Sequence, residues 1–132
     1  MNDSGKTFFA PQLYIRSGVK NIDFYSRAFG AVELRRWSNE DGTIHVAELS
    51  INGALFHLHE QGTGDDIFAP DRYQGTTTLI GLFVPDVHAF MEQAKAAGAI
   101  EISPVQDYDY GYRQGQLQDP FGHCWLIQMQ LT

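Results

Sequence analysis

The chain has 132 residues, of which 43% are hydrophobic and 13% aromatic, a composition typical of a globular domain and not of a disordered segment. Nine basic and 16 acidic side chains give a net charge of −7, which disfavours nucleic-acid and anionic membrane partners through like-charge repulsion. The lone cysteine, Cys124, excludes an intrachain disulfide and is typical of a reducing compartment. Residues 1–7 are polar and no apolar run is long enough for a signal peptide or a membrane span, so we expect a cytoplasmic protein with one domain over residues 1–132.

The first half of the chain predicts a β-α-β-β-β order over residues 8–60, after a disordered start at residues 1–7. Apolar residues recur on one helical face until Gly30 ends the helix. Asn52 and Gly53 are typical of a type I′ turn, because both tolerate positive φ, and they predict a tight hairpin. The expected strands span residues 8–16, 31–38, 43–51 and 54–60, and the helical face consists of Val19, Ile22, Tyr25, Ala28 and Phe29.

The second half of the chain repeats the plan of the first. Gly-Ala-Val-Glu-Leu at residues 30–34 returns 68 residues later as Gly-Ala-Ile-Glu-Ile at residues 98–102. A polar linker at residues 61–76 therefore precedes a second module at residues 77–130, in which Asp86 is a plausible helix N-cap. The expected strands span residues 77–84, 101–108, 112–118 and 123–129, and the helical face consists of Val87, Phe90, Ala94 and Ala97.

These elements predict an α+β fold in which two tandem β-α-β-β-β modules form one curved mixed sheet, with a central cup inside and the helices outside. Counting outward from the predicted hairpin places Glu48 opposite His57 and Val46 opposite His59. Side chains alternate between the faces of a strand, so these four point into the cup and His45 points to the helices. The expected helix-facing core is Leu13, Ile15, Ile22, Tyr25, Phe29, Leu49, Phe56, Leu58, Phe90, Leu117, Trp125 and Ile127.

Two histidines and a glutamate give the cup face its strongest chemical signal. His57 and His59 lie two residues apart on one strand with Glu48 across from His57, and these are ligand types for a divalent metal such as Zn, Ni or Fe. Glu48 could instead accept a hydrogen bond from His57 in a wet pocket without metal, and both interpretations stay open. Nearby aromatic and cationic side chains favour a small organic ligand with an anionic or polar group. The expected ligand-binding residues are Tyr14, Arg16, Trp37, Glu48, His57, His59, Tyr108, Tyr110, Arg113 and Gln116.

Two segments resemble the glyoxalase/bleomycin-resistance/extradiol-dioxygenase superfamily, also called vicinal oxygen chelate proteins. Residues 21–31, NIDFYSRAFGA, are similar to its first-helix signature, and residues 119–125, DPFGHCW, to the turn before its last strand. The duplicated plan matches along residues 8–130. The resemblance implies a homodimer in which modules from two chains assemble each site.

The resemblance also implies where a metal would bind. Metal enzymes of this superfamily place His or Glu at four strand positions, which fall here near Gln12, on His57, on Leu79 (or Ile80) and on Leu126. His57 alone is a good ligand, so the pattern resembles the metal-free members, which bind a planar or cationic drug. We therefore expect a small-molecule-binding protein without a cofactor. The alternative is a divalent-metal-dependent lyase, isomerase or dioxygenase built on the glutamate and two histidines of the cup face.

Overall fold

The computed structural model describes residues 5–63 and 67–132. Residues 1–4 of the expected disordered start and residues 64–66 of the expected linker lie outside the described residues. No helix in the two described ranges is both long and apolar enough to cross a membrane.

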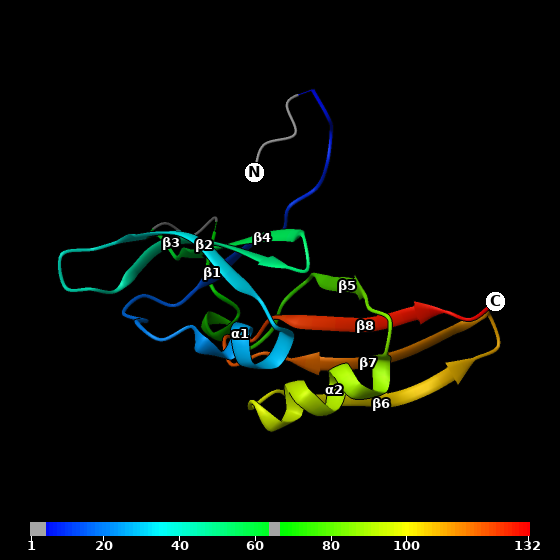
Figure 1. Ribbon diagram of the computed structural model, residues 1–132. Coiled ribbons are helices and arrows are strands. Elements are labelled where there is room, and N and C mark those ends of the chain that lie inside the picture. Colours follow the sequence, from blue (N-terminus) through cyan, green and yellow to red (C-terminus); the bar gives the residue numbers. More distant parts are fainter. Residues whose placement is uncertain (1–4, 64–66) are drawn as a thin grey trace.

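Each half of the chain folds as the expected β-α-β-β-β module, as Figure 1 shows. The predicted strand and helix types are confirmed, and the short 3₁₀ helix Pro70–Arg72 lies in the connection between the modules. The first module comprises β1 (Gln12–Ile15), α1 (Asp23–Phe29), β2 (Val32–Ser38), β3 (Ile44–Ile51) and β4 (Ala54–Glu60). The second comprises β5 (Leu79–Phe83), α2 (Val87–Ala96), β6 (Ile100–Tyr108), β7 (Tyr112–Gln118) and β8 (Cys124–Gln130).

The strands form two four-stranded sheets, one in each module, and not the single curved sheet that we expected. The strand orders are β1-β4-β3-β2 in the first sheet and β5-β8-β7-β6 in the second. In each sheet the first strand runs parallel to the last, and the other pairs are antiparallel. β1 and β5 are edge strands that do not hydrogen-bond to each other, so the two sheets remain separate within one chain.

The register predicted from the hairpin is confirmed. Asn52 and Gly53 both have positive φ, 50° and 92°, as a type I′ turn requires, and Glu48 pairs with His57. The prediction for His45 is wrong, because a register shift between β2 and β3 interrupts the alternation near the start of β3. Ile44 is buried instead, and the side chain of His45 is 59% exposed.

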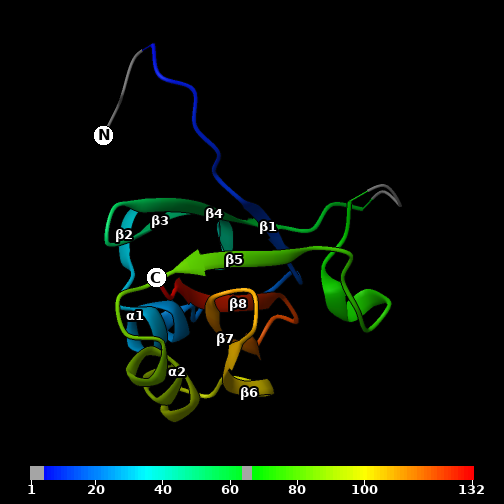
Figure 2. The ribbon, with the colours of Figure 1, turned by 90° about the vertical axis from the view of Figure 1, so that its right-hand side faces the viewer.

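The two modules share one apolar core, into which the helix-facing side of each sheet packs. The ring of Phe56 in the first sheet lies 5.5 Å from that of Trp125 in the second, measured between centroids. Tyr25 of α1 contacts both of these rings, and α1 and α2 lie side by side (Figure 2). The predicted core residues are buried except Phe90, which is half-buried and packs against the core.

This packing corrects the expected cup between the modules of one chain. The buried face of α1 contacts both sheets through Tyr25, and its other face, which carries Ser26 and Arg27, is exposed, so the helix lies at the surface as expected. Glu48 and His57 alternate with core residues on the first sheet, and Gln116 alternates with core residues on the second. The polar face of each sheet therefore points away from the core, so the two faces do not line a common cup within one chain.

Candidate functional site

The first sheet presents a polar and aromatic face away from the core, and most of the expected ligand-binding residues of the first module lie on it. Strand pairing arranges the side chains in two rows that cross all four strands. One row is Gln12, His57, Glu48 and Arg35, and the other is Tyr14, His59, Val46 and Trp37. We refer to these eight residues as the first-sheet face.

Three residues of this face, Gln12, Arg35 and Val46, were missing from the expected ligand-binding set, although the hairpin count had placed Val46 on the face. Arg35 pairs with Glu48 across β2 and β3. Extending the hairpin count by one more strand was the only signal that could have found it, and a register shift between Glu33 and Arg35 makes that count unreliable. Gln12 pairs with His57 across a parallel ladder, whose register no turn fixes in sequence.

Glu48 and His57 form the most enclosed charged pair of the face. His57 Nε2 lies 3.8 Å from Glu48 Oε2, and the side chains are only 20% and 23% exposed. This distance is too long for a direct hydrogen bond, so the two groups attract each other as an ion pair only when His57 is protonated. Both side chains therefore keep hydrogen-bonding capacity that a ligand can use.

His59 is held more tightly than His57. Its Nε2 lies 2.7 Å from Gln12 Oε1, and its ring stacks on Tyr14 with the centroids 5.2 Å apart. Burial lowers the pKa of His59, and the nearby His57 and His45 lower it further, because each disfavours a positive charge there. His59 thus favours its neutral form and gives the face a fixed aromatic surface beside Tyr14.

The Glu48, His57 and His59 set is the alternative metal site. The hydrogen bond to Gln12 already occupies one nitrogen of His59. Within residues 5–63 and 67–132, no three or more His, Cys, Asp or Glu side chains come together as a metal ion would need. Metal binding by these three side chains stays the alternative hypothesis.

Arg35 and Trp37 form the rim of the face on the edge strand β2. The guanidinium carbon of Arg35 lies 4.5 Å from the centroid of the Trp37 ring, which is 40% exposed. Such a stacked geometry is attractive, because the face of the indole ring is electron-rich. The rim therefore combines a cation and a large aromatic surface.

The two arginines of the expected set lie away from this face. Arg16 pairs with Asp71 at 3.7 Å and stacks over Phe121 at 5.0 Å, beyond the end of β1. Arg113 makes two hydrogen bonds to Asp107, of 2.7 and 3.1 Å, and its donors lower the pKa of that carboxyl group. Arg113 alternates with the outward residues of β7, so it lies on the helix-facing side of the second sheet.

Tyr108, Tyr110 and Gln116 belong to the outward face of the second sheet. Tyr108 and Tyr110 stack with their centroids 5.4 Å apart, and the Tyr110 hydroxyl donates to Gln114 at 2.6 Å. Gln114 in turn donates to Gln128 at 2.8 Å. Within one chain, this aromatic and amide-rich surface is separated from the first-sheet face by the shared core.

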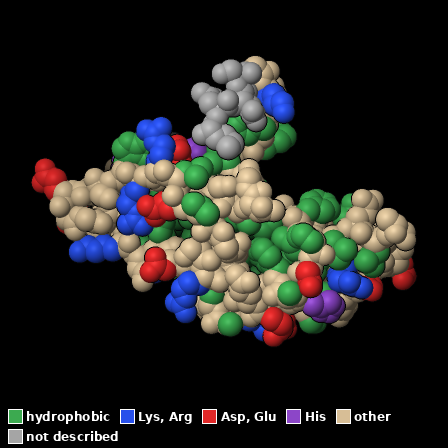
Figure 3. All heavy atoms as spheres, in the orientation of Figure 1, with side chains coloured by type: hydrophobic (Ala, Val, Ile, Leu, Met, Phe, Trp, Pro, Cys, Tyr) green, Lys and Arg blue, Asp and Glu red, His purple; other side chains and the backbone are tan. Residues whose placement is uncertain are grey.

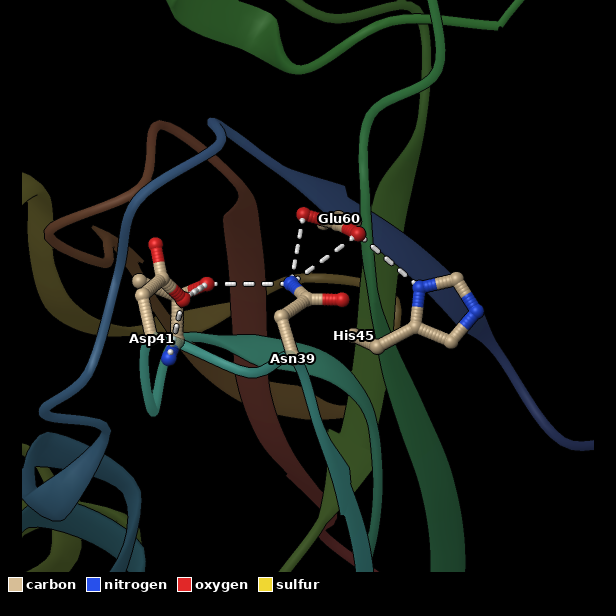
Figure 4. Close-up of polar contacts among 5 residues, drawn as sticks. Asn39, Asp41, His45 and Glu60 are labelled. Atoms are coloured by element: carbon tan, nitrogen blue, oxygen red, sulfur yellow. Dashed lines mark hydrogen bonds and ion pairs between the residues drawn. The ribbon is translucent and has the colours of Figure 1, made fainter.

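A second polar cluster, drawn in Figure 4, lies where the β2–β3 turn meets the end of β4. Glu60 accepts hydrogen bonds from Asn39 at 3.2 and 3.3 Å and lies 2.9 Å from Nδ1 of His45. Thr43 donates to Asp41 at 2.6 Å, and this bond lowers the pKa of Asp41. These contacts tie the turn to β4, which gives the cluster a structural role.

The model of the Glyoxalase/Bleomycin resistance protein/Dioxygenase superfamily matches residues 10–127. The chain belongs to this superfamily. The resemblance of its two sequence motifs is thus confirmed, and so is the doubled module on which it rests.

Two mycobacterial relatives, both described as uncharacterized proteins, share 39% identity with the chain over 121 residues. The alignment covers 89% of this chain, together with 80% of the Mycobacterium bovis protein and 71% of a Mycobacterium tuberculosis protein. The names of these relatives give neither an activity nor a ligand.

Three solved structures of other proteins have the same fold. TioX from Micromonospora sp. ML1 is 25% identical, with a TM-score of 0.68 over 94% of this chain and all of its own. A gene product of Arabidopsis thaliana is 24% identical, with a TM-score of 0.72 over 94% and 99% of the two chains. The fosfomycin resistance protein FosX from Listeria monocytogenes is 19% identical, with a TM-score of 0.66 over 93% and 92%. The last two likenesses concern the fold alone.

The structure also locates the four positions that the resemblance relates to metal ligands. Gln12 lies beside His57 on the first sheet, so these two share a face. Leu79 and Leu126 lie on the second sheet, and neither carries a ligating atom. A metal centre in this member would therefore need ligands besides His57 from outside the four strand positions.

Proposed function

We propose that this chain binds a small organic molecule on the first-sheet face and needs no metal to do so. The convergence of Tyr14, Trp37, Glu48, His57 and His59 on one face that points away from the shared core carries the proposal. A plain solvated strand face would not combine aromatic rings with an enclosed Glu–His pair. Ring faces suit a planar ligand, and the free hydrogen-bonding capacity of Glu48 and His57 suits its polar groups.

We further propose that a second copy of the chain covers this face and makes a homodimer with two equivalent sites. The edge strand β5 exposes Leu79 and Phe83, which are 46% and 61% accessible, and Figure 3 shows hydrophobic side chains gathered over this part of the molecule. β1 and β5 also have unpaired edges, which proteins usually cover. In such a dimer the tyrosines and glutamines of the partner's second sheet would supply the opposite wall of each site.

A thermal-shift screen of metabolites and aromatic antibiotics tests ligand binding, because a compound that binds the native state raises the melting temperature. We expect His57→Gln to remove the shift given by an active compound while the unliganded melting temperature stays close to that of the parent. His88→Gln is the matched control, since His88 lies exposed on α2. A shift that survives His57→Gln and Tyr14→Leu would refute this location of the site.

Metal analysis of the purified protein separates the proposal from the alternative enzyme. A lyase, isomerase or dioxygenase that uses Glu48, His57 and His59 requires stoichiometric zinc, nickel, iron or a similar divalent ion. If such an ion is retained, removed by a chelator and lost on His57→Gln, the metal-free proposal fails and the enzyme is favoured.

Light scattering tests the dimer. We expect a dimer mass at micromolar protein, and a monomer mass for Phe83→Glu, which places a charge on the exposed side of β5. If the parent protein is monomeric and still binds its ligand at the first-sheet face, the shared site is wrong.

A further inference from the structure

Two neighbouring arginines on β2 have opposite surroundings. Arg36 is held by Glu33 through two contacts, of 2.7 and 3.1 Å. No carboxylate of the described residues lies within 4 Å of the Arg35 guanidinium, although Glu48 pairs with Arg35 in the strand register. Arg113 lies 2.7 Å from Asp107, and Arg16 makes a longer ion pair of 3.7 Å with Asp71. An acidic chain that pairs these three arginines leaves the charge of Arg35 available on the face where we propose that a ligand binds.

The contact with Trp37 prepares Arg35 for binding. The Trp37 ring lies against the Arg35 guanidinium, whose N–H groups can still donate hydrogen bonds to a ligand. Because the contact restricts the side chain, less conformational entropy is lost when a ligand binds. A carboxylate matches the fork of N–H groups with two parallel hydrogen bonds, and an aromatic body attached to it can lie along the exposed indole ring.

Glu48 limits which anions fit. It pairs with Arg35 across β2 and β3, so its carboxylate lies on the same face and repels additional negative charge. A ligand with one negative charge and a hydrogen-bond donor avoids this repulsion and can give its donor to Glu48. Phosphate monoesters, which carry more than one negative charge at neutral pH, are disfavoured.

From these contacts we infer that Arg35 and Trp37 are the specificity determinants of the site and that its ligand is a planar aromatic monoanion bound through its carboxylate. This inference rests on the proposed function, because it assigns the ligand class of the same face. Arg35 recognises the charge, Trp37 supports the ring, and Glu48 selects against a second charge.

The test uses 2-naphthoate as the probe and its neutral amide, 2-naphthamide, as the matched compound. The chain has two tryptophans, so the indole N–H region of an NMR spectrum contains two signals. We expect 2-naphthoate to move the signal of Trp37 and to leave that of Trp125, which is buried and donates to Asp119. We expect Arg35→Gln to weaken 2-naphthoate binding about tenfold or more, as for loss of a charge-assisted hydrogen bond. 2-Naphthamide should bind the parent protein more weakly by a similar factor.

Arg36→Gln is the control variant, since it removes the same charge one residue away where Glu33 already neutralises it. It should bind 2-naphthoate as the parent protein does, whereas Arg35→Lys should bind weakly because lysine lacks the planar fork. Equal affinities of Arg35→Gln and the parent, equal affinities for acid and amide, or no movement of the Trp37 signal would each overturn the inference. The proposed function would survive any of these results if a neutral or cationic compound still gave a thermal shift that depends on His57.

Discussion

The carboxylate of Asp119 is the polar centre of the shared core, and its replacement by asparagine tests how the modules are joined. Asp119 is 2% exposed and accepts four hydrogen bonds. One oxygen accepts from the backbone N–H groups of Phe121 and His123, at 2.9 and 3.0 Å. The other accepts from the Tyr25 hydroxyl at 2.6 Å and from Trp125 Nε1 at 3.0 Å. The bond to Tyr25 connects the second module to α1 of the first.

Asp119→Asn keeps the shape of the side chain but turns one oxygen into an NH2 group that faces two donors. Each buried donor left without an acceptor costs about 1–3 kcal/mol, so the substitution should lower the free energy of unfolding by about 2–6 kcal/mol. Because the whole domain is stabilised by only about 5–15 kcal/mol, this is a large fraction of the total.

Urea denaturation followed by tryptophan fluorescence measures the effect. Asp109→Asn is the matched control, since Asp109 is exposed in the β6–β7 turn, and it should change the free energy of unfolding by less than about 0.5 kcal/mol. Tyr25→Phe removes one of the four bonds and should cost about 1.5–3 kcal/mol. If Asp119→Asn unfolds at the same urea concentration as the control, the carboxylate does not hold the modules together.

Three further results are expected. Trp125→Ala should cost about 3–5 kcal/mol in urea denaturation, because it leaves a cavity at the contact with Phe56; an unchanged midpoint would show that Trp125 lies outside the core. The pKa of Tyr25 is raised well above 10.0 by burial and then by Asp119, so the unfolded chain ionises first and stability should fall as pH rises above that value. Tyr25→Phe should lose less stability than the parent over this alkaline range, and equal losses would count against the assignment. The pKa of His59 is lowered by burial and by neighbouring histidines, so its ring signals should titrate by NMR below pH 6.5. In His57→Gln this pKa should rise, because one neighbouring imidazole is removed. Titration of His59 at or above 6.5 would contradict its burial beside Tyr14.

Local features of the sequence determined the modules and most of the first-sheet face. Asn52 and Gly53 fix a two-residue turn, and a turn of known length fixes the register of the strands that leave it. Alternation of side chains then placed Glu48 and His57 together without any knowledge of the tertiary fold. The helices could be predicted equally well, because apolar spacing and a following glycine depend only on nearby residues.

Strand irregularities, long-range side-chain partners and the packing of the two sheets were decided by the tertiary structure alone. Register shifts decide which faces Arg35 and His45 occupy, and such bulges depend on how β2 fits its neighbour. Arg113 pairs with Asp107 across β6 and β7, and the irregular register of these two strands cannot be predicted from the sequence. The packing of both sheets on α1 joins apolar surfaces that are far apart in the chain. Because burial of apolar area is non-directional, the sequence pattern of a core face does not say which other face will cover it.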